Sequence, residues 1–198
     1  MKLAFAISPG RGDVDLLMAS LSEVLQVDGL RVCGTVQVNS ERPDDGPCDM
    51  DVKILPEGPV IRISQSLGKA SRGCRLDPDA LESAVGLVGA RLAAGADVLI
   101  INKFGKHEAE GRGFRDLIAE AIGREIPVLV GLNRLNAPAF QEFCGGLAVE
   151  LPPHAADLAA WVWEAVAAQD GRRSVHINPS PQTAISAAPA SVSGRGAA

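Results

Sequence analysis

The chain has 198 residues, of which 46% are hydrophobic and 22% charged, and its formal net charge is -5. This length and composition predict one soluble globular domain with a substantial core, and they exclude a wholly disordered chain. The acidic balance argues against nonspecific nucleic-acid binding, because that binding needs a basic surface that displaces counterions. Nucleic acid is therefore not an expected partner.

Targeting segments and a disulfide framework are not indicated. The apolar run after Lys2 ends at the turn "SPGRG", which is too early for the apolar core of a signal peptide. No stretch approaches the apolar length that crosses a membrane, so we expect a cytoplasmic protein without membrane insertion. The cysteines lie far apart without C-x-x-C spacing, which argues against structural zinc and predicts no metal site. They are Cys33, Cys48, Cys74 and Cys144.

Short apolar runs alternate with helical patterns along most of the chain. Several runs are apolar throughout, as in strands that are covered on both faces. The alternation predicts an α/β fold of three layers with a mostly parallel sheet. The predicted strands are residues 3–7, 31–38, 52–55, 60–63, 98–101, 128–130 and 147–149.

Four amphipathic helices are predicted between these strands from apolar residues at three- and four-residue spacing. The second begins at "LDPD", with Asp77 as its N-cap and Pro78 at its first helical position. We expect a single α/β domain over residues 1–168 and a disordered tail rich in Ala, Ser and Pro over 169–198. The predicted apolar faces are Val14, Leu17, Met18, Leu21, Val24 and Leu25; Leu81, Val85, Val88 and Leu92; Phe114, Leu117, Ile118 and Ile122; and Leu158, Trp161, Val162 and Ala165.

The turn "SPGRGD" follows the first predicted strand and precedes a helix, which is the local order of a P-loop. The lysine and the following Ser or Thr of a P-loop are missing, because Asp13, Val14 and Asp15 follow Gly12. Carboxylates in a first helical turn suit the helix dipole themselves and repel a phosphate there. The residues therefore favour a turn with an Asp N-cap over a phosphate-binding loop.

A second loop, "ISQSLGKASRGCRLD", follows the fourth predicted strand. It has no acidic residue before Asp77. Hydroxyl groups, free backbone N–H groups and arginine side chains suit a tetrahedral oxyanion, while a solvated basic loop is an equally weighted alternative. The candidate ligands are Ser64, Ser66, Lys69, Ser71, Arg72 and Arg75.

A third loop, in "VLIINKFGKHEAEGRGFRDLI", follows the fifth predicted strand. Ligands bind beyond the carboxyl ends of strands in open α/β sheets, so its polar residues are site candidates by position. Part of its charge has an ordinary alternative, because Glu108, Arg112 and Arg115 follow one another at i,i+4 and i,i+3 spacings that allow charged residues to pair along a helix. His107 alone is more typical of a surface residue than of a ligand or base. The candidates are Asn102, Lys103, Lys106 and Glu108.

The motifs "SQSLGKASRGCRLD" and "INKFGKHEAEGRGFRD" resemble a bacterial family, the domain-of-unknown-function family numbered 2478. The resemblance covers residues 3–167 and brings no assigned reaction. Members of this family often occur beside molybdate-transport genes. The resemblance therefore implies a protein partner in molybdate transport.

A more distant similarity links the chain to small P-loop nucleoside triphosphatases with a strand-end D-E-x-G-K-x-E motif. In "NKFGKHE", Gly105, Lys106 and Glu108 match that motif, whereas Asn102 and Lys103 replace its two leading acids. The similarity implies a P-loop-like fold with degenerate Walker motifs. It also implies that Arg134, in "PVLVGLNRLNAPAF", lines the same cleft.

The first functional hypothesis is a non-hydrolysing ligand-binding or accessory protein that holds a small oxyanion or a nucleotide. Molybdate is the oxyanion that the family's gene neighbourhood suggests, and Mg²⁺ is an expected cofactor only for a nucleotide. The alternative is a nucleoside triphosphatase or phosphotransferase with Glu108 as base and Lys106 or Arg134 stabilising charge. A third hypothesis gives Cys74 a reactive thiol beside arginines. A homodimer is compatible with the sequence, although no exposed stripe demands one.

Overall fold

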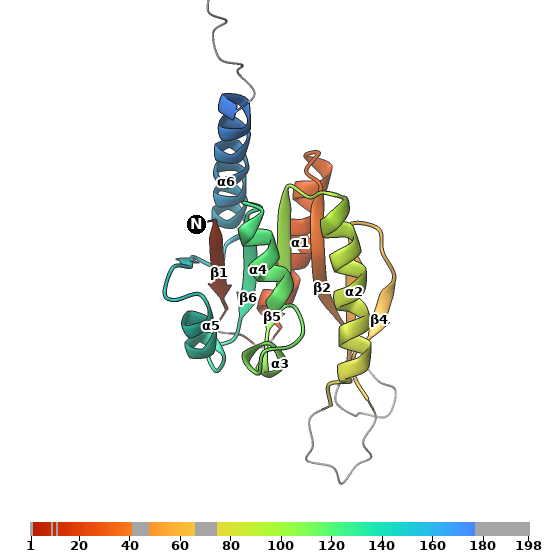
Figure 1. The fold of residues 1–198 in the computed structure, drawn as a ribbon. Helices are drawn as coiled ribbons and strands as arrows, with labels where there is room; N and C mark the ends of the chain where they lie inside the picture. Colours follow the sequence, from red (N-terminus) through yellow and green to blue (C-terminus); the bar gives the residue numbers. More distant parts are fainter. Residues whose placement is uncertain (1, 9, 11, 41–47, 66–74, 177–198) are drawn as a thin grey trace, which may run out of the picture.

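The computed structural model describes residues 2–8, 10, 12–40, 48–65 and 75–176, which form a sheet between two layers of helices (Figure 1). The sheet has seven strands in the order β4-β3-β2-β5-β6-β1-β7. Neighbours from β2 to β7 pair in parallel, whereas β3 pairs antiparallel with both β2 and β4. The strands are β1 (Leu3–Ile7), β2 (Val32–Ser40), β3 (Asp49–Leu55), β4 (Val60–Arg62), β5 (Val98–Phe104), β6 (Val128–Leu132) and β7 (Val149–Leu151).

The helices cover both faces of the sheet, which confirms the predicted α/β fold of three layers. One buried apolar cluster joins α1 and α6 to the sheet, and a second joins α2, α4 and α5 to the other face. Figure 1 shows α2 and α4 in front of the sheet and α1 behind it. The helices are α1 (Asp13–Val27), α2 (Pro78–Ala94), α3 (Lys106–Ala109), α4 (Arg115–Gly123), α5 (Ala137–Phe143) and α6 (Ala155–His176).

The central strands are apolar because helices cover both of their faces. Every residue of β6 and the first five of β5 are buried. The polar side chains at the end of β5 therefore emerge where the core ends, at the carboxyl edge of the sheet. Strands β1, β2, β5 and β6 end at this edge.

The start of α1 differs from the predicted Asp N-cap. Gly12 is the N-cap, with φ at 87°, and Asp13 is the first helical residue. Asp13 instead accepts a hydrogen bond of 3.2 Å from Ser8 Oγ. A left-handed backbone at the helix entrance suits glycine, so conformation rather than capping chemistry decides this position. The cap of α2 is confirmed, since the Asp77 side chain accepts from the N–H groups of Asp79 and Ala80.

Two further boundaries differ from the sequence prediction. Strand β7 pairs with β1 from Val149 onward, while Leu147 is 64% exposed before the strand begins. Helix α6 continues to His176, so residues 169–176 of the predicted tail are helical. Gln169 is buried in that helix and interrupts the apolar pattern without ending the helix. Residues 177–198 of the predicted tail lie outside the described residues.

Among the helices of the described ranges, none combines the length and the apolar character that a membrane crossing requires.

Candidate functional site

A cavity of about 770 Å³ lies at the carboxyl edge of the sheet. It is bounded by the N-terminus of α1, by β2, β3 and β5, and by residues of α2 and α3. Its volume is within the usual range for small-molecule sites. Its polar lining includes Asp15, Thr35, Gln37, Arg75, Asn102, Lys103 and Lys106, and its apolar lining includes Met50, Val52, Ile63, Leu81 and Phe114.

The most buried polar contact of the cavity joins β5 to α1. Asn102 Nδ2 donates a hydrogen bond of 2.7 Å to Asp15 Oδ1. Both side chains line the cavity, and Asn102 is 2% exposed and Asp15 4% exposed. The second polar atom of the amide, Asn102 Oδ1, is buried and has no hydrogen-bond partner within the described structure. One acceptor of a residue at the cavity is therefore enclosed without a donor.

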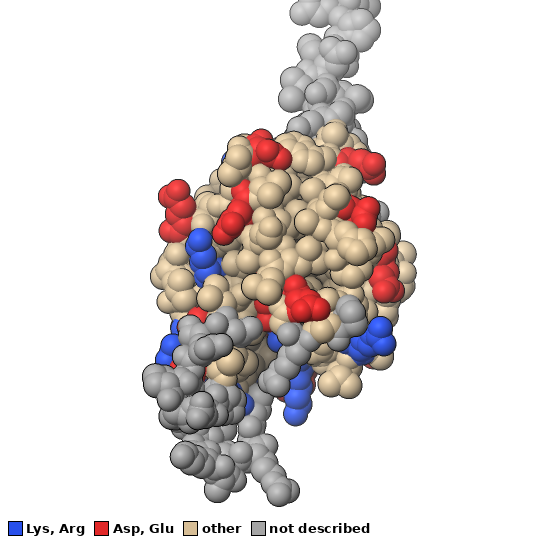
Figure 2. Space-filling model, turned by 180° about the vertical axis from the view of Figure 1, so that it is seen from behind, with Lys and Arg blue, Asp and Glu red and all other residues tan. Residues whose placement is uncertain are grey.

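The cationic residues of the cavity are more exposed than this amide and carboxylate. Lys103 is exposed, and the Lys106 side chain is 82% exposed and lies 3.6 Å from Glu110 Oε1. Arg75 donates to the backbone oxygen of Cys48 at 3.0 Å and to Asp49 Oδ1 at 3.2 Å. Figure 2 shows that most of the Lys and Arg side chains visible on the rear face lie in the lower half of the molecule.

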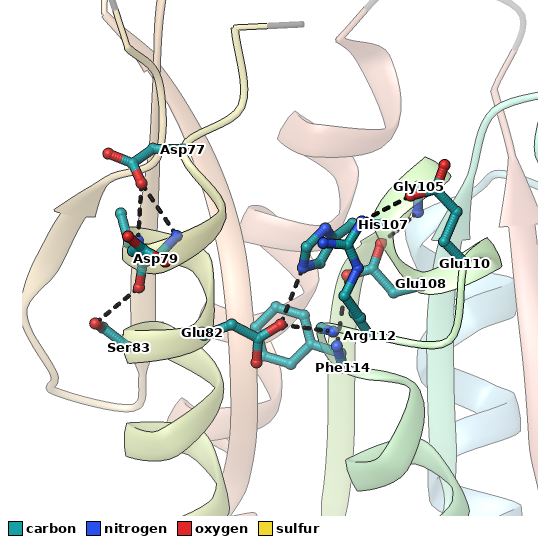
Figure 3. A network of polar contacts seen from close by, with 12 residues as sticks. Asp77, Asp79, Glu82, Ser83, Gly105, His107, Glu108, Glu110, Arg112 and Phe114 are labelled. Carbon is teal, nitrogen blue, oxygen red and sulfur yellow. Dashed lines mark hydrogen bonds and ion pairs between the residues drawn. The ribbon is translucent and has the colours of Figure 1, made fainter.

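Glu108 is a buried carboxylate that holds the loop after β5. Its Oε2 accepts from the Gly105 N–H at 2.8 Å and its Oε1 from the Phe114 N–H at 3.4 Å (Figure 3). Burial raises the pKa of Glu108 above its usual value, although these N–H groups and the nearby His107 act against the shift. Both oxygens of Glu108 therefore serve the loop itself.

The alternative that Glu108, Arg112 and Arg115 pair along one helix is wrong. Arg112 instead donates to Glu110 at 2.7 Å, and Arg115 lies over the ring of Phe143 at 4.5 Å. The reason is that α3 ends at Ala109 and a turn separates it from α4, so the helical spacing is interrupted.

His107 is buried rather than a surface residue, and its partner is Glu82 of α2. His107 Nε2 lies 2.9 Å from Glu82 Oε1, which also accepts from the Gly113 N–H at 2.9 Å. Burial acts to raise the pKa of Glu82, but the hydrogen bonds from His107 and Gly113 outweigh it, so the pKa is lowered. Sequence reasoning missed Glu82, because nothing in the pattern of α2 marks this exposed helical position.

The contacts of Glu108 also explain why residue 113 is a glycine. Gly113 has φ at 60°, and a Cβ there would contact Glu108 Oε1. The signal for this turn was present in the sequence as two glycines in "EGRGF".

The remaining predicted ligands divide into three groups. Ser64 is buried, donates to Asp49 Oδ1 at 3.2 Å and accepts from the Met50 N–H at 3.0 Å, so it supports the base of its loop. Arg134 is exposed in the turn after β6 and is absent from the described lining of the cavity. Ser66, Lys69, Ser71, Arg72 and Cys74 lie outside the described residues.

Two buried polar side chains on β2, Thr35 and Gln37, also line the cavity and were missed. The available signal was their alternation with Val36 in "RVCGTVQ", which places Cys33, Thr35 and Gln37 on one face of the strand. In the part of the chain that the structure describes, no three His, Cys, Asp or Glu side chains gather as a metal site.

Comparison with solved structures places the fold among small P-loop nucleoside triphosphatases. THEP1 from the hyperthermophile Aquifex aeolicus is 20% identical with a TM-score of 0.57, over 78% of this chain and 90% of that chain. A human cancer-related nucleoside triphosphatase is 17% identical with a TM-score of 0.55, over 86% of this chain and 98% of that chain. These similarities confirm the predicted P-loop-like fold.

A curated relative is the molybdenum import ATP-binding protein ModC 2 of Bradyrhizobium diazoefficiens. It is 36% identical over 149 residues, which are 75% of this chain and 17% of that protein. The chain therefore spans less than a fifth of the length of this relative. A family model described as "Protein of unknown function (DUF2478)" matches residues 3–161. The chain therefore belongs to the DUF2478 family, as its loop motifs predicted.

Proposed function

We propose that this protein is a non-hydrolysing ligand-binding protein on a degenerate P-loop-like scaffold, with a nucleotide as its ligand in the cavity at the carboxyl edge. The observation that carries the proposal is the buried hydrogen bond between Asn102 and Asp15. It lies where the first turn of α1 meets the end of β5.

In P-loop enzymes a Ser or Thr of the loop and an acid at a strand end hold Mg²⁺ beside the phosphates. In this chain Val14 follows Asp13 where the hydroxyl is needed, and Asn102 replaces the acid. The amide of Asn102 donates to the nearby carboxylate of Asp15, so a hydrogen bond joins the two elements at this position. A hard cation such as Mg²⁺ prefers carboxylates and water oxygens, and in this pair one carboxylate oxygen of Asp15 is already occupied by the Asn102 amide, which makes the pair a weaker magnesium site than a hydroxyl and an acid.

The size and lining of the cavity favour a nucleotide over a bare oxyanion. A volume of about 770 Å³ is far larger than a four-oxygen anion needs. Apolar side chains such as Met50, Leu81 and Phe114 give part of the wall a surface suited to an aromatic ring. An oxyanion alone would leave this apolar wall unused.

The alternative of a triphosphatase with Glu108 as general base has weaker support. A general base must reach the proton that it abstracts, and both Glu108 oxygens already accept backbone N–H groups. Lys106 remains suited to charge stabilisation because its side chain is exposed at the cavity.

An accessory role in molybdenum import is the cellular context that we propose. Its support is the relative that is named a molybdenum import ATP-binding protein, in which the similar segment is 17% of the whole length. The proposed partner is accordingly a component of a molybdenum transporter, and the proposed location is the cytoplasm.

Two measurements on the full chain test the proposal: release of phosphate from nucleotides, and binding of nucleotides and oxyanions. ATP, GTP and their diphosphates are each incubated with the protein and Mg²⁺, and binding of the same nucleotides, molybdate, tungstate, sulfate and phosphate is followed by calorimetry. We expect saturable nucleotide binding without phosphate release above a blank. Mg²⁺-dependent phosphate release would restore the triphosphatase alternative, and binding of molybdate or another oxyanion alone would replace the nucleotide.

A further inference from the structure

We propose that the base of the nucleotide lies on the face of the sheet that β2 and β3 turn toward α2, and that the Thr35 hydroxyl binds the edge of the base. This inference rests on the proposed function and adds a specificity-determining residue to it. The part of the cavity concerned is lined by β2 and β3 on one side and by the first turn of α2 on the other.

The pairing of the strands decides which side chains form this face. Successive side chains of a strand point to opposite faces, and residues directly opposite in neighbouring strands share a face. Gln37 of β2 pairs with Val52 of β3, so Thr35 and Gln37 lie on the same face as Val52. Two residues before Thr35, Cys33 Sγ donates to the Val88 backbone oxygen of α2 at 3.6 Å. This face of β2 and β3 is therefore turned toward α2.

The residues of this face suit a base rather than a phosphate. The side chains that β2 and β3 contribute to the described cavity lining are uncharged, namely Thr35, Gln37, Met50 and Val52. Leu81, from the first turn of α2, is buried and lines the same cavity. A phosphate here would have no cation from either strand, whereas apolar side chains with a few neutral polar groups suit a heteroaromatic ring.

Thr35 supplies a hydroxyl that the protein itself does not use. The residue is 2% exposed, and in the part of the chain that the structure describes its hydroxyl makes no hydrogen bond. Among the described residues, the enclosed side-chain atoms without a partner belong to Lys2 and Asn102, so the Thr35 hydroxyl is open to the cavity that the residue lines.

The chemistry of this hydroxyl points to recognition of a base. It can donate or accept a hydrogen bond, so it can pair with a ring nitrogen, a carbonyl oxygen or an amino group. Valine would fill the same position in a buried strand without an unused polar group, so packing alone does not call for threonine. A site that hydrogen-bonds one group of a ligand rejects analogues that lack the group, so Thr35 should make the cavity selective among bases.

The test is a calorimetric titration of the full chain with ATP, GTP, CTP and UTP and with the matching monophosphates. Within the set that binds, we expect the wild-type protein to prefer one base by about tenfold or more. Thr35→Val keeps the shape of the side chain and removes the hydroxyl. It should weaken the preferred nucleotide by about tenfold, the effect of one lost hydrogen bond, and leave the other three nearly unchanged. Thr35→Ser retains the hydroxyl and should retain the preference.

Ser83→Ala is the matched control, because it removes an exposed hydroxyl of α2 that donates to the Asp79 backbone oxygen and is absent from the described cavity lining. It should change none of the affinities. The inference is overturned if the wild type binds all four bases alike, or if folded Thr35→Val binds as the wild type. Equal weakening of all four nucleotides by Thr35→Val would also overturn it, because that result indicates altered packing. If no nucleotide binds to the wild type, the proposed function itself fails.

Discussion

Asn102 and Asp15 are 87 residues apart in the chain, yet their side chains meet in a buried hydrogen bond of 2.7 Å. The bond ties the end of β5 to the first turn of α1, the two elements between which a P-loop enzyme holds its metal and phosphates. A neutral amide thus donates to a carboxylate at the position on which the proposed function depends.

This contact should also support the fold. Asn102→Ala removes the donor and leaves the Asp15 carboxylate buried without it, so we expect a loss of about 1–3 kcal/mol in the free energy of unfolding. Denaturant unfolding of both proteins measures the difference. Asn136→Ala is the control, because the Asn136 side chain makes no cap hydrogen bond, and it should change stability by less than about 0.5 kcal/mol. Equal effects of the two substitutions would contradict the account.

Glu108 should give stability a distinct pH dependence. Burial raises its folded pKa above the ordinary value of 4.5, so the folded state binds the proton more tightly than the unfolded state does. The related stability is fully present below pH 4.5 and is lost as pH rises through the folded pKa. The stability advantage of the wild type over Glu108→Gln should therefore shrink as pH rises from 4.5, as measured by urea unfolding at a series of pH values. An advantage that grows with pH would contradict the raised pKa.

A side chain at position 113 should lower the free energy of unfolding. Gly113→Ala combines φ at 60° with a contact between the new Cβ and Glu108 Oε1, so we expect a loss of about 1–2 kcal/mol. Thermal unfolding compares it with Gly123→Ala, which adds a Cβ in open space at the end of α4 and should be neutral or slightly stabilising. The interpretation fails if both alanine variants unfold at the wild-type temperature.

The cysteines should differ in reactivity. Burial raises the pKa of Cys33 to about 11, so almost no thiolate forms at neutral pH. Cys48 is exposed and lines the cavity. Iodoacetamide labelling followed by peptide mass spectrometry should modify Cys48 long before Cys33, and a bound nucleotide should slow the labelling of Cys48. Unchanged labelling in the presence of saturating nucleotide would place the ligand elsewhere.

The sequence predicted the sheet well, because strands such as β5 and β6 are buried on both faces and therefore apolar throughout. It located the ends of elements less well. Leu147 is apolar but lies outside β7, and the buried Gln169 interrupts an apolar pattern that α6 continues. In both places tertiary packing, rather than local hydrophobicity, determines where the strand begins or the helix ends.

The sequence indicated which residues lie at the cavity more reliably than it indicated what each of them does. Asn102 and Lys103 do line the cavity, because both lie at the carboxyl end of a central strand. Glu108 was assigned as a base from a motif, whereas the fold commits both of its oxygens to backbone N–H groups. Glu82 contacts His107 from another helix, and this pairing of residues that are 25 positions apart has no local signal.

The central claim is that the cavity binds a nucleotide without Mg²⁺. Its most direct test is the dissociation constant of AMP and of ATP, measured by calorimetry once with excess EDTA and once with Mg²⁺. The account predicts saturable binding of at least one of them with the same affinity in both buffers, because Asn102 stands in place of the metal-binding acid and donates to Asp15. Binding that appears only with Mg²⁺ would contradict it.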